Sequence, residues 1–277
     1  MKKNTFFFVR TAIEYKETDV IVIQIQIKKN AKGQNVKKPI IVVNMFFAQY
    51  DEPRQAHIVR DEYVQRVHDT GGMPVLMPVI DDPELMQFYL NLADGVLLIG
   101  GKDYPAELYH ETSLPATDRS RLRPEFDLHF ARELLKTSLP VLGICGGCQL
   151  LAIAANGKLI QYLPNAEDVH TSGKFHSARV IRDGFFRRIM KDETEFTVNS
   201  FHHQAVNPEF PGEGFVITGE AMDGSVEAIE MPGPRMVLGV QFHPERMNTL
   251  SNRFLGCLVR CAAAHRDGLP TDSIFQQ

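Results

Sequence analysis

The 277-residue chain has few cysteines, and it lacks long hydrophobic runs and any excess of basic residues. Four cysteines are too few for a disulfide scaffold in a chain of this length. We therefore expect a reducing compartment, where a thiol is catalytic, metal-binding or buried. No apolar stretch approaches the roughly 18–20 residues that span a bilayer, and Arg10 closes the apolar start of the chain early. These absences predict a cytoplasmic protein that does not enter a membrane.

The net charge of the chain argues against nucleic acid and anionic membranes as partners. Lysine and arginine number 30 against 34 aspartate and glutamate residues, which gives a formal net charge of −4 at pH 7. No long basic run interrupts this balance, so nucleic acid and anionic membranes are poor partners on electrostatic grounds. Small molecules or proteins remain as partners, and the oligomeric state, a homodimer included, stays open. A hydrophobic fraction of 44% supplies ample material for the core of one large domain.

Hydrophobic strand-like runs alternate with amphipathic, helix-length segments. The strand-like runs lie at 39–46, 73–80, 94–101 and 140–144. The helical patterns lie near 55–70, after 81–83, and over about 124–137 and 147–155. Continuous apolar strands separated by helices are typical of a parallel sheet that is covered on both faces. The pattern therefore predicts an α/β sandwich.

Two parts of the chain depart from this alternation. From about residue 158 the strands are shorter and closely separated by turn residues. This predicts an antiparallel or mixed extension, followed by a C-terminal helix from about residue 248. Residues 1–38 form an N-terminal extension in which 20–29, "VIVIQIQIKK", alternates as an edge strand would, among polar neighbours. We expect an added strand or a poorly ordered leader there, and one domain over residues 39–277.

The stretch "PVLGICGGCQL" places Cys145 where a buried strand meets a helix. In a parallel α/β sheet, ligands gather outside the carboxyl ends of the strands. At a helix N-terminus the free backbone N–H groups favour a thiolate and can bind an anion. Gly146 and Gly147 allow a sharp turn and the close approach of a substrate carbonyl, as in a nucleophile elbow. Free cysteine also packs as a small hydrophobe, so Cys145 alone leaves a structural role open.

A thiol nucleophile needs a base, and "LGVQFHPER" supplies a histidine at the end of another strand. His243 can take the thiol proton and later give it to a leaving amine. Glu245 can fix the tautomer of the ring and stabilise the imidazolium, and Pro244 stiffens the turn between them. One histidine among ten is more often structural, but its conjunction with Cys145 favours a cysteine hydrolase.

Four segments carry a resemblance to a known family: "DGVLLIGGKDYPAELY", "LGICGGCQLLAIAANGKLIQYL", "VNSFHHQAV" and "LGVQFHPE". Over about residues 39–265 the chain resembles the class I glutamine amidotransferase-like superfamily, and within it the stand-alone gamma-glutamyl hydrolases of the peptidase C26 type. The resemblance implies a three-layer α/β sandwich with a central, mostly parallel sheet and a flavodoxin-like core. It also implies cleavage of gamma-glutamyl compounds, such as gamma-glutamyl-GABA or a gamma-glutamyl-polyamine, to glutamate and free amine through a thioester.

The same resemblance assigns roles by position in these motifs. Cys145 is the nucleophile, His243 the general base and acid, and Glu245 the orienting carboxylate. The backbone N–H groups of Gly101 and Gly146 form the oxyanion hole, where one donor typically contributes about 10²- to 10³-fold in rate. The residues that line the gamma-glutamyl pocket are Gln149, Ser200, His202 and His203.

Two positions depart from the pattern of the closest hydrolases. Gly146 stands where an arginine usually follows the nucleophile, and Cys148 where methionine or histidine is common. We therefore expect the leaving-group side of the pocket to differ. His202 and His203 also suggest a metal, but adjacent residues of an extended segment point to opposite sides and a third ligand is missing. We expect no metal there, and no cofactor in the reaction.

Three alternatives remain open on the sequence. Cys145 and Cys148 form a CxxC, which is also typical of thiol–disulfide oxidoreductases but leaves His243 unexplained. A structural zinc site could join this pair to Cys257 and Cys261, which are spaced i, i+4 on one helix. The third alternative is a glutaminase subunit that delivers ammonia to a synthetase. Since the chain contains no second catalytic domain, that interpretation requires a separate subunit.

Overall fold

The computed structural model describes residues 28–29, 35–36, 38–51, 54–118, 120–191 and 193–275. The chain divides into two compact units, residues 1–37 and residues 38–277. In the first unit, β1 (Lys28–Lys29) and β2 (Asn35–Val36) form a two-stranded antiparallel sheet. Most of the alternating stretch at 20–29 lies outside the described residues, so the expectations for residues 1–38 stay predictions.

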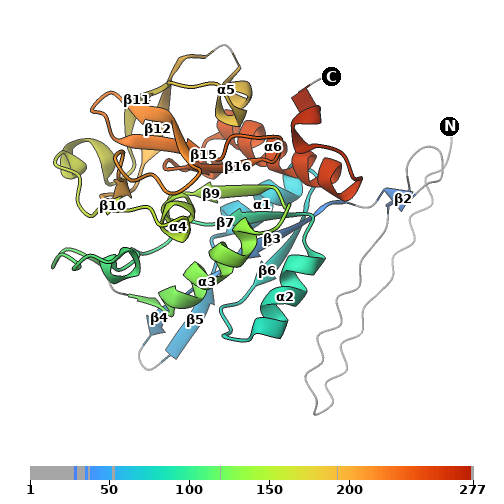
Figure 1. Ribbon diagram of the computed structural model, residues 1–277, viewed down its shortest axis with the longest axis horizontal. Helices are drawn as coiled ribbons and strands as arrows, with labels where there is room; N and C mark the ends of the chain where they lie inside the picture. Colours follow the sequence, from blue (N-terminus) through green and yellow to red (C-terminus); the bar gives the residue numbers. More distant parts are fainter. Residues whose placement is uncertain are drawn as a thin grey trace. The chain divides into compact units, whose positions relative to one another are not determined.

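A nine-stranded sheet forms the centre of the second unit (Figure 1). Its strands are β3 (Ile40–Asn44), β6 (Met73–Met77), β7 (Gly95–Leu98), β9 (Val141–Ile144), β11 (Lys174–Val180), β12 (Glu195–Ser200), β14 (Val216–Ala221), β15 (Val226–Glu230) and β16 (Val237–Val240). Their order is β12-β11-β14-β15-β16-β9-β7-β3-β6. Pairing is parallel from β16 to β6 and antiparallel from β12 to β16. The predicted parallel core with an antiparallel extension is confirmed.

Helices cover both faces of this sheet. The described residues form α1 (Asp61–Asp69), α2 (Pro83–Leu92), α3 (Pro124–Leu135), α4 (Gly146–Ala154), α5 (Phe185–Met190) and α6 (Asn248–Arg266). Alternate residues of β3 face opposite layers, because Val42 packs with α2, α3 and α4 whereas Val43 packs with α1, α5 and α6. Figure 1 shows the two helical layers on either side of the strands. The second unit is therefore a three-layer α/β sandwich, as predicted.

Local sequence explains where α2 begins. The carboxylate of Asp82 accepts hydrogen bonds from the backbone N–H groups of Glu84 and Leu85, and Pro83 occupies the first helical position. An acidic N-cap followed by proline is a favourable helix start, because the proline lacks only an N–H that has no helical partner. The helix expected after residues 81–83 is confirmed at this boundary.

A second, smaller antiparallel sheet corrects one prediction. It consists of β4 (Phe46–Asp51), β5 (Arg54–Ile58) and β8 (Arg121–Leu122). The helical pattern expected near 55–70 is wrong at its start, since residues 54–58 are a strand and α1 begins at Asp61. Pairing with β4, with the His57 ring stacked on Phe47 at a centroid distance of 4.7 Å, overrides the local periodicity. A further short pair joins β10 (Leu159–Ile160) to β13 (Ala205–Val206).

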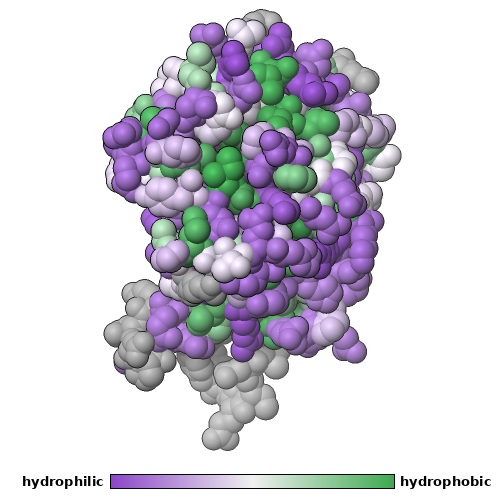
Figure 2. All heavy atoms as spheres, turned by 60° about the vertical axis from the view of Figure 1, so that its left-hand side comes forward, coloured by the Kyte–Doolittle hydropathy of each residue, from purple (hydrophilic) through white to green (hydrophobic). Residues whose placement is uncertain are grey.

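Hydrophobic side chains on the face drawn in Figure 2 lie in separate groups among hydrophilic ones. Within the described ranges, no helix combines the length and the apolar character needed to cross a membrane. The compartment of the protein and its oligomeric state stay predictions. The loops that follow the parallel strands β9 and β16 carry Cys145 and His243.

Candidate active site

Cys145 lies at the carboxyl end of β9, on the turn that begins α4. Its φ and ψ are 53° and −107°, a conformation that a residue with a Cβ rarely adopts and that stores strain. Its neighbours hold the turn in place. The N–H of Cys145 donates to the carbonyl of Val240 at 2.8 Å, and its own carbonyl accepts from the N–H of Gln149 at 3.1 Å. The predicted succession of strand, cysteine on a sharp turn and helix is present here.

His243 follows β16, the strand next to β9, and so lies at the same edge of the sheet. Its Nδ1 is 2.7 Å from Oε1 of Glu245, which lies in the 3₁₀ turn Pro244–Arg246. Because the carboxylate accepts the Nδ1 proton, Nε2 is left for proton exchange. Asn199 fixes the backbone of the histidine: Oδ1 accepts from the His243 N–H at 2.8 Å, and Nδ2 donates to the His243 carbonyl at 3.0 Å.

The surroundings of His243 favour its protonated form. Burial lowers the pKa of the ring, but the charge of Cys145, a hydrogen bond with that side chain and the Glu245 carboxylate outweigh burial and raise the pKa of His243 to about 9. A histidine that is held in its protonated form beside a cysteine is typical of enzymes that use a cysteine nucleophile. Gln241 adds a donor to the sulfur, with Nε2 3.6 Å from Sγ of Cys145.

The backbone of Gly100 and Gly101 closes over the thiol. A Cβ on Gly100 would lie 3.1 Å from Cε1 of His243 and 3.3 Å from Cβ of Cys145, so only glycine fits there without displacing one of them. The N–H of Gly100 donates to the Tyr63 hydroxyl at 3.1 Å, so it is not free to bind an oxyanion. The nitrogen of Gly101 lies 3.3 Å from the place of a Cβ on Gly146. The two glycines expected to form the oxyanion hole are thus neighbours beside Cys145.

Arg121, which the sequence did not single out, supports this glycine loop from behind. Its Nε donates to the carbonyl of Lys102 at 3.0 Å, and its Nη1 pairs with Asp127 at 2.6 Å. The guanidinium lies over the ring of Tyr104, 4.2 Å from the centroid. Its Nη2 fills the space that a Cβ on Gly101 would need. An arginine is therefore present beside the turn at Cys145, supplied by a distant part of the chain.

Most of the predicted site residues line one cavity of about 390 Å³. Cys145, His243, Gly101, Gln149, His202 and His203 contribute to its wall. Ser200 does not line it, because this side chain is fully buried and its Oγ donates to the carbonyl of His170 at 2.8 Å. Gln149 uses its Nε2 within the protein, bonding the Gln204 carbonyl at 3.0 Å. The wall also contains residues that were not predicted individually: Phe46, Arg60, Tyr63, Ile99, Gly100, Lys102, Asp103, Asp118, Phe201, Gln204 and Arg246.

Acidic residues of the cavity are paired. Asp118 lies 2.6 Å from Nζ of Lys102, and Asp103 lies 3.0 Å from Nε2 of His203. The hydrogen bond with Asp103 raises the pKa of His203. His202 lies deeper, where burial lowers the pKa of the ring well below its ordinary value. Asp118 and Asp103 therefore each have a basic side chain as a partner.

Two arginines lie on the His243 side of the cavity, and Nε of Arg246 is 3.5 Å from Oε1 of Glu245. The Arg246 guanidinium lies over the Phe201 ring, 4.3 Å from its centroid, and that ring meets His243 edge-on at 5.5 Å. Arg60 is exposed and makes no hydrogen bond or ion pair with another described side chain. It directly precedes α1, the helix that carries Tyr63, whose hydroxyl is 3.4 Å from Nδ1 of His243. This side of the cavity is therefore aromatic and positively charged.

The sheet separates the cysteines that the two rival interpretations would join. Cys148 packs in the core on one face, whereas Cys145, Cys257 and Cys261 belong to the core on the other. All four are free thiols. Burial raises the pKa of Cys148 well above its ordinary value, so this thiol is a poor nucleophile. The fold supports neither a redox CxxC nor a zinc site made from the four sulfurs.

Comparison with known proteins adds a family and relatives. The family model of peptidase C26 matches residues 39–245, which contain Cys145, His243 and Glu245. The chain is 33% identical over 198 residues to a Mycobacterium tuberculosis protein provisionally named a glutamine amidotransferase, covering 67% of this chain and 61% of that one. It thus spans less than two thirds of that relative. Identity is 27% over 204 residues to a gamma-glutamyl-gamma-aminobutyrate hydrolase of Escherichia coli O157:H7, covering 68% of this chain and 78% of the relative.

A solved structure supports the fold. It is a Thermoplasma acidophilum protein that is provisionally named as part of a GMP synthase, with a TM-score of 0.58 and 15% sequence identity. The match covers 83% of this chain and 96% of the other. At this identity the likeness shows the fold alone, and it agrees with the α/β sandwich described above.

Proposed function

The chain belongs to the peptidase C26 family, and on this premise we propose that it is a cysteine hydrolase that cleaves the gamma-glutamyl amide bond of a small compound. The observation that carries the proposal is the meeting of Cys145 with His243, whose Nδ1 is held by Glu245 at 2.7 Å, beside the Gly101 and Gly146 backbone. Acyl transfer from an amide needs a nucleophile, a proton carrier and oxyanion donors, and these residues supply all three.

The first half of the reaction makes a thioester. The Cys145 thiolate attacks the γ-carbonyl carbon, and the carbonyl electron pair moves onto oxygen. The N–H groups of Gly101 and Gly146 stabilise that oxyanion. His243 gives its Nε2 proton to the amine nitrogen as the C–N bond breaks. The amine leaves, and the glutamyl group stays bound to the sulfur.

The second half releases glutamate. A water molecule takes the place of the amine, and Nε2 of His243 removes its proton as the oxygen attacks the thioester carbon. The tetrahedral intermediate uses the same donors and collapses with cleavage of the C–S bond. Glutamate leaves, and the thiolate and imidazolium are restored. Glu245 stabilises the imidazolium in both halves.

Charges near His243 favour an amine that carries a carboxylate. Because His243 protonates the departing nitrogen, the amine must lie on its side of the cavity, next to Phe201, Arg246 and Arg60. Two guanidinium groups attract a carboxylate and repel a polyamine. Gamma-glutamyl-GABA has such a carboxylate, and the relative from Escherichia coli O157:H7 is named for the hydrolysis of this compound.

A second candidate, glutaminase activity in the service of a synthetase, is favoured by the names of other relatives. The Mycobacterium tuberculosis protein and a Lactococcus lactis protein, 32% identical over 201 residues and covering 67% of this chain and 80% of that one, are provisionally named for glutamine amidotransferases. Ammonia as the leaving group has no carboxylate and would leave Arg60 without a partner, whereas Arg246 also lies 3.5 Å from Oε1 of Glu245. The geometry therefore favours the hydrolase of gamma-glutamyl amines.

Trapping the thioester tests the chemistry directly. The protein is mixed with gamma-glutamyl-GABA, quenched in acid, digested and examined by mass spectrometry. We expect one glutamyl group on the peptide that contains Cys145, and none after Cys145→Ala. Cys148→Ala, in the same peptide, is the matched control and keeps the adduct. Glutamate release without any adduct on Cys145, or in the Cys145→Ala variant, contradicts the mechanism.

A further inference from the structure

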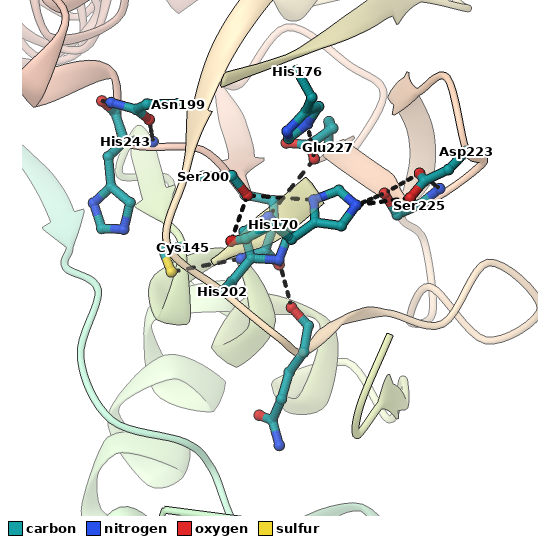
Figure 3. A network of polar contacts seen from close by, with 12 residues as sticks. Cys145, His170, His176, Asn199, Ser200, His202, Asp223, Ser225, Glu227 and His243 are labelled. Carbon is teal, nitrogen blue, oxygen red and sulfur yellow. Dashed lines mark hydrogen bonds and ion pairs between the residues drawn. The ribbon is translucent and has the colours of Figure 1, made fainter. Parts of the chain in front are cut away.

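A buried polar cluster lies next to the Phe201–Gln204 stretch of the cavity wall. Figure 3 shows His170, His176, His202 and Glu227 pointing toward one another from separate segments. They come from the π-helical turn Ala166–His170, from β11, from the segment that follows β12 and from β15. Their side chains are between 0% and 8% exposed. The proposed hydrolysis uses none of their ionisable groups.

The hydrogen bonds of His202 leave one ring nitrogen with a free lone pair. Nδ1 lies 3.0 Å from the carbonyl of Gln204, and since a carbonyl can only accept, Nδ1 carries the proton. Nε2 of the neutral ring is then an acceptor, and it has no hydrogen-bond partner in the described parts of the chain. The nearby charged atom is Oε1 of Glu227 at 3.8 Å, which is also an acceptor.

His170 repeats this arrangement. Its Nε2 lies 2.8 Å from Oδ2 of Asp223, so this nitrogen donates and Nδ1 presents a lone pair. The Oγ of Ser200 lies 3.3 Å from Nδ1, but it donates its proton to the His170 carbonyl at 2.8 Å. Oε2 of Glu227 also lacks a hydrogen-bond partner among the described residues. Two imidazole lone pairs and Oε2 of Glu227 are therefore buried together without a donor among the described residues, an arrangement that costs free energy unless an electrophile joins them.

These features match the surroundings of a metal ion. Histidine ligands of metals usually donate their other ring N–H to a carboxylate or a backbone carbonyl, as His170 does to Asp223 and His202 to Gln204. Ligand atoms of His170, His176 and Glu227 all lie within 4.8 Å of one another. Tetrahedral zinc with bonds of about 2.1 Å places its ligands roughly 3.4 Å apart, so small side-chain movements close the site.

We propose that His170, His176, His202 and Glu227 bind one divalent transition-metal ion, with Zn²⁺ the best match to three imidazoles and one carboxylate. His176 now donates from Nε2 to Glu227 at 2.9 Å, and binding moves that proton to Nδ1, which is unpartnered among the described residues. Four protein ligands fill a tetrahedral site, so the ion is structural. The expectation of no metal rested on a missing third ligand, and the fold supplies ligands from three other segments.

Such an ion would fix part of the wall of the cavity. It ties His202, and with it the stretch from Phe201 to Gln204, to β11 and β15. Because binding energy of this kind is gained only in the folded state, the metal adds to the free energy of unfolding. The inference goes beyond the proposed hydrolysis and does not depend on it.

Metal content tests the proposal without a substrate. The full chain is produced in zinc-containing medium, purified without chelators and analysed by inductively coupled plasma mass spectrometry. We expect one zinc per chain in the wild type and in His129→Ala, a control in the exposed part of α3. Glu227→Gln should lose the zinc. Asp223→Asn keeps all four ligands and should weaken zinc affinity roughly 10- to 100-fold.

Two further measurements cover the case that a variant fails to fold. Cobalt-loaded wild type should show the visible absorption of tetrahedral Co²⁺, and removal of zinc with 1,10-phenanthroline should lower the melting temperature until zinc is returned. Wild-type protein without stoichiometric metal, whose melting temperature does not respond to added zinc, overturns the proposal. That result leaves the hydrolase mechanism untouched, since neither readout involves catalysis.

Discussion

The hydroxyl of Tyr63 accepts a hydrogen bond of 3.1 Å from the backbone N–H of Gly100. The same oxygen lies 3.4 Å from Nδ1 of His243, so one side chain contacts both the glycine loop and the base. Burial, with the charges of Glu245 and Cys145, raises the pKa of Tyr63 well above its ordinary value and keeps the hydroxyl neutral. Tyr63 therefore acts as a positioning residue for the peptide that leads to Gly101.

Tyr63→Phe removes this acceptor with little change of volume. A neutral hydrogen bond contributes about 0.5–1.5 kcal/mol, so we expect kcat to fall roughly 2- to 10-fold while KM changes little. Tyr89→Phe on α2 is the matched control and should behave as wild type. Steady-state kinetics on gamma-glutamyl-GABA measure both. An unchanged kcat in Tyr63→Phe shows that the loop holds its geometry without the hydroxyl.

Replacing His243 and Glu245 one at a time should separate the effect of proton transfer from the effect of stabilising the imidazolium. His243→Ala removes a step that commonly contributes about 10²- to 10⁴-fold, and we expect kcat/KM to fall by that factor. Glu245→Gln should cost less, because the amide oxygen still accepts the Nδ1 proton at the 2.7 Å contact but no longer carries the charge that stabilises the imidazolium. His68→Ala, in the exposed part of α1, is the control. Full activity in His243→Ala is incompatible with the assigned triad.

The pH dependence follows from the pKa of His243, which is raised to about 9. Below that pH the ring holds the proton that the leaving amine needs, and above it the proton is lost. We therefore expect kcat/KM to decline as pH rises through about 9. In Glu245→Gln one cause of the raised pKa is gone, so the decline should begin at lower pH. A wild-type profile that stays flat through pH 9 contradicts the role of His243 as acid.

Breaking the buried ion pair of Arg121 and Asp127 should destabilise the fold. Both side chains are at most 3% exposed and their charged atoms are 2.6 Å apart. Asp127→Asn leaves the guanidinium without its counter-charge and should lower the free energy of unfolding by about 3–5 kcal/mol. The double variant Arg121→Met, Asp127→Leu should recover much of this stability but lose activity, because the Lys102 carbonyl loses its donor. Denaturant unfolding and kinetics on the same samples test both expectations. Equal stability of Asp127→Asn and wild type refutes the first.

The sequence predicted those parts of the site that are encoded locally. Cys145 was identifiable because strand, thiol, two glycines and helix are contiguous, and His243 because it ends an apolar strand two residues before Glu245. The parallel core followed from continuous apolar runs, since burial on both faces leaves that pattern. These local patterns can be recognised without knowing which segments contact one another in the fold.

The residues that were missed depend on contacts between distant segments. Tyr63 is 180 positions from His243, and within its helix it looks like an ordinary core residue. Arg121 meets Lys102 across a loop that has no periodic pattern. The start of α1 was misjudged because residues 54–58 gain more from pairing with β4 than from a helical turn. His170 and Glu227 come together only when β11, β15 and the turn before them are assembled.

Reversing the charge of Arg60 or Arg246 should change the preference for the leaving group. Arg60→Glu and Arg246→Glu reverse charge on the His243 side of the cavity. We expect each to lower the ratio of kcat/KM for gamma-glutamyl-GABA to kcat/KM for gamma-glutamyl-putrescine, because a carboxylate is then repelled and an ammonium attracted. Arg246→Glu should also lower both values, since Arg246 lies 3.5 Å from Oε1 of Glu245. Arg132→Glu, on α3, is the control and should change neither. An unchanged ratio in both variants would show that the arginines do not contact the leaving group.

The central claim is that this protein by itself hydrolyses gamma-glutamyl amines. The most direct measurement is kcat/KM of the purified chain for gamma-glutamyl-GABA, gamma-glutamyl-putrescine and glutamine, followed as glutamate release with Cys145→Ala as the blank. The account predicts that gamma-glutamyl-GABA is cleaved faster than both of the others. A clear preference for glutamine, or activity that arises only when a second protein is added, contradicts it and assigns the chain to the glutaminases that serve a synthetase.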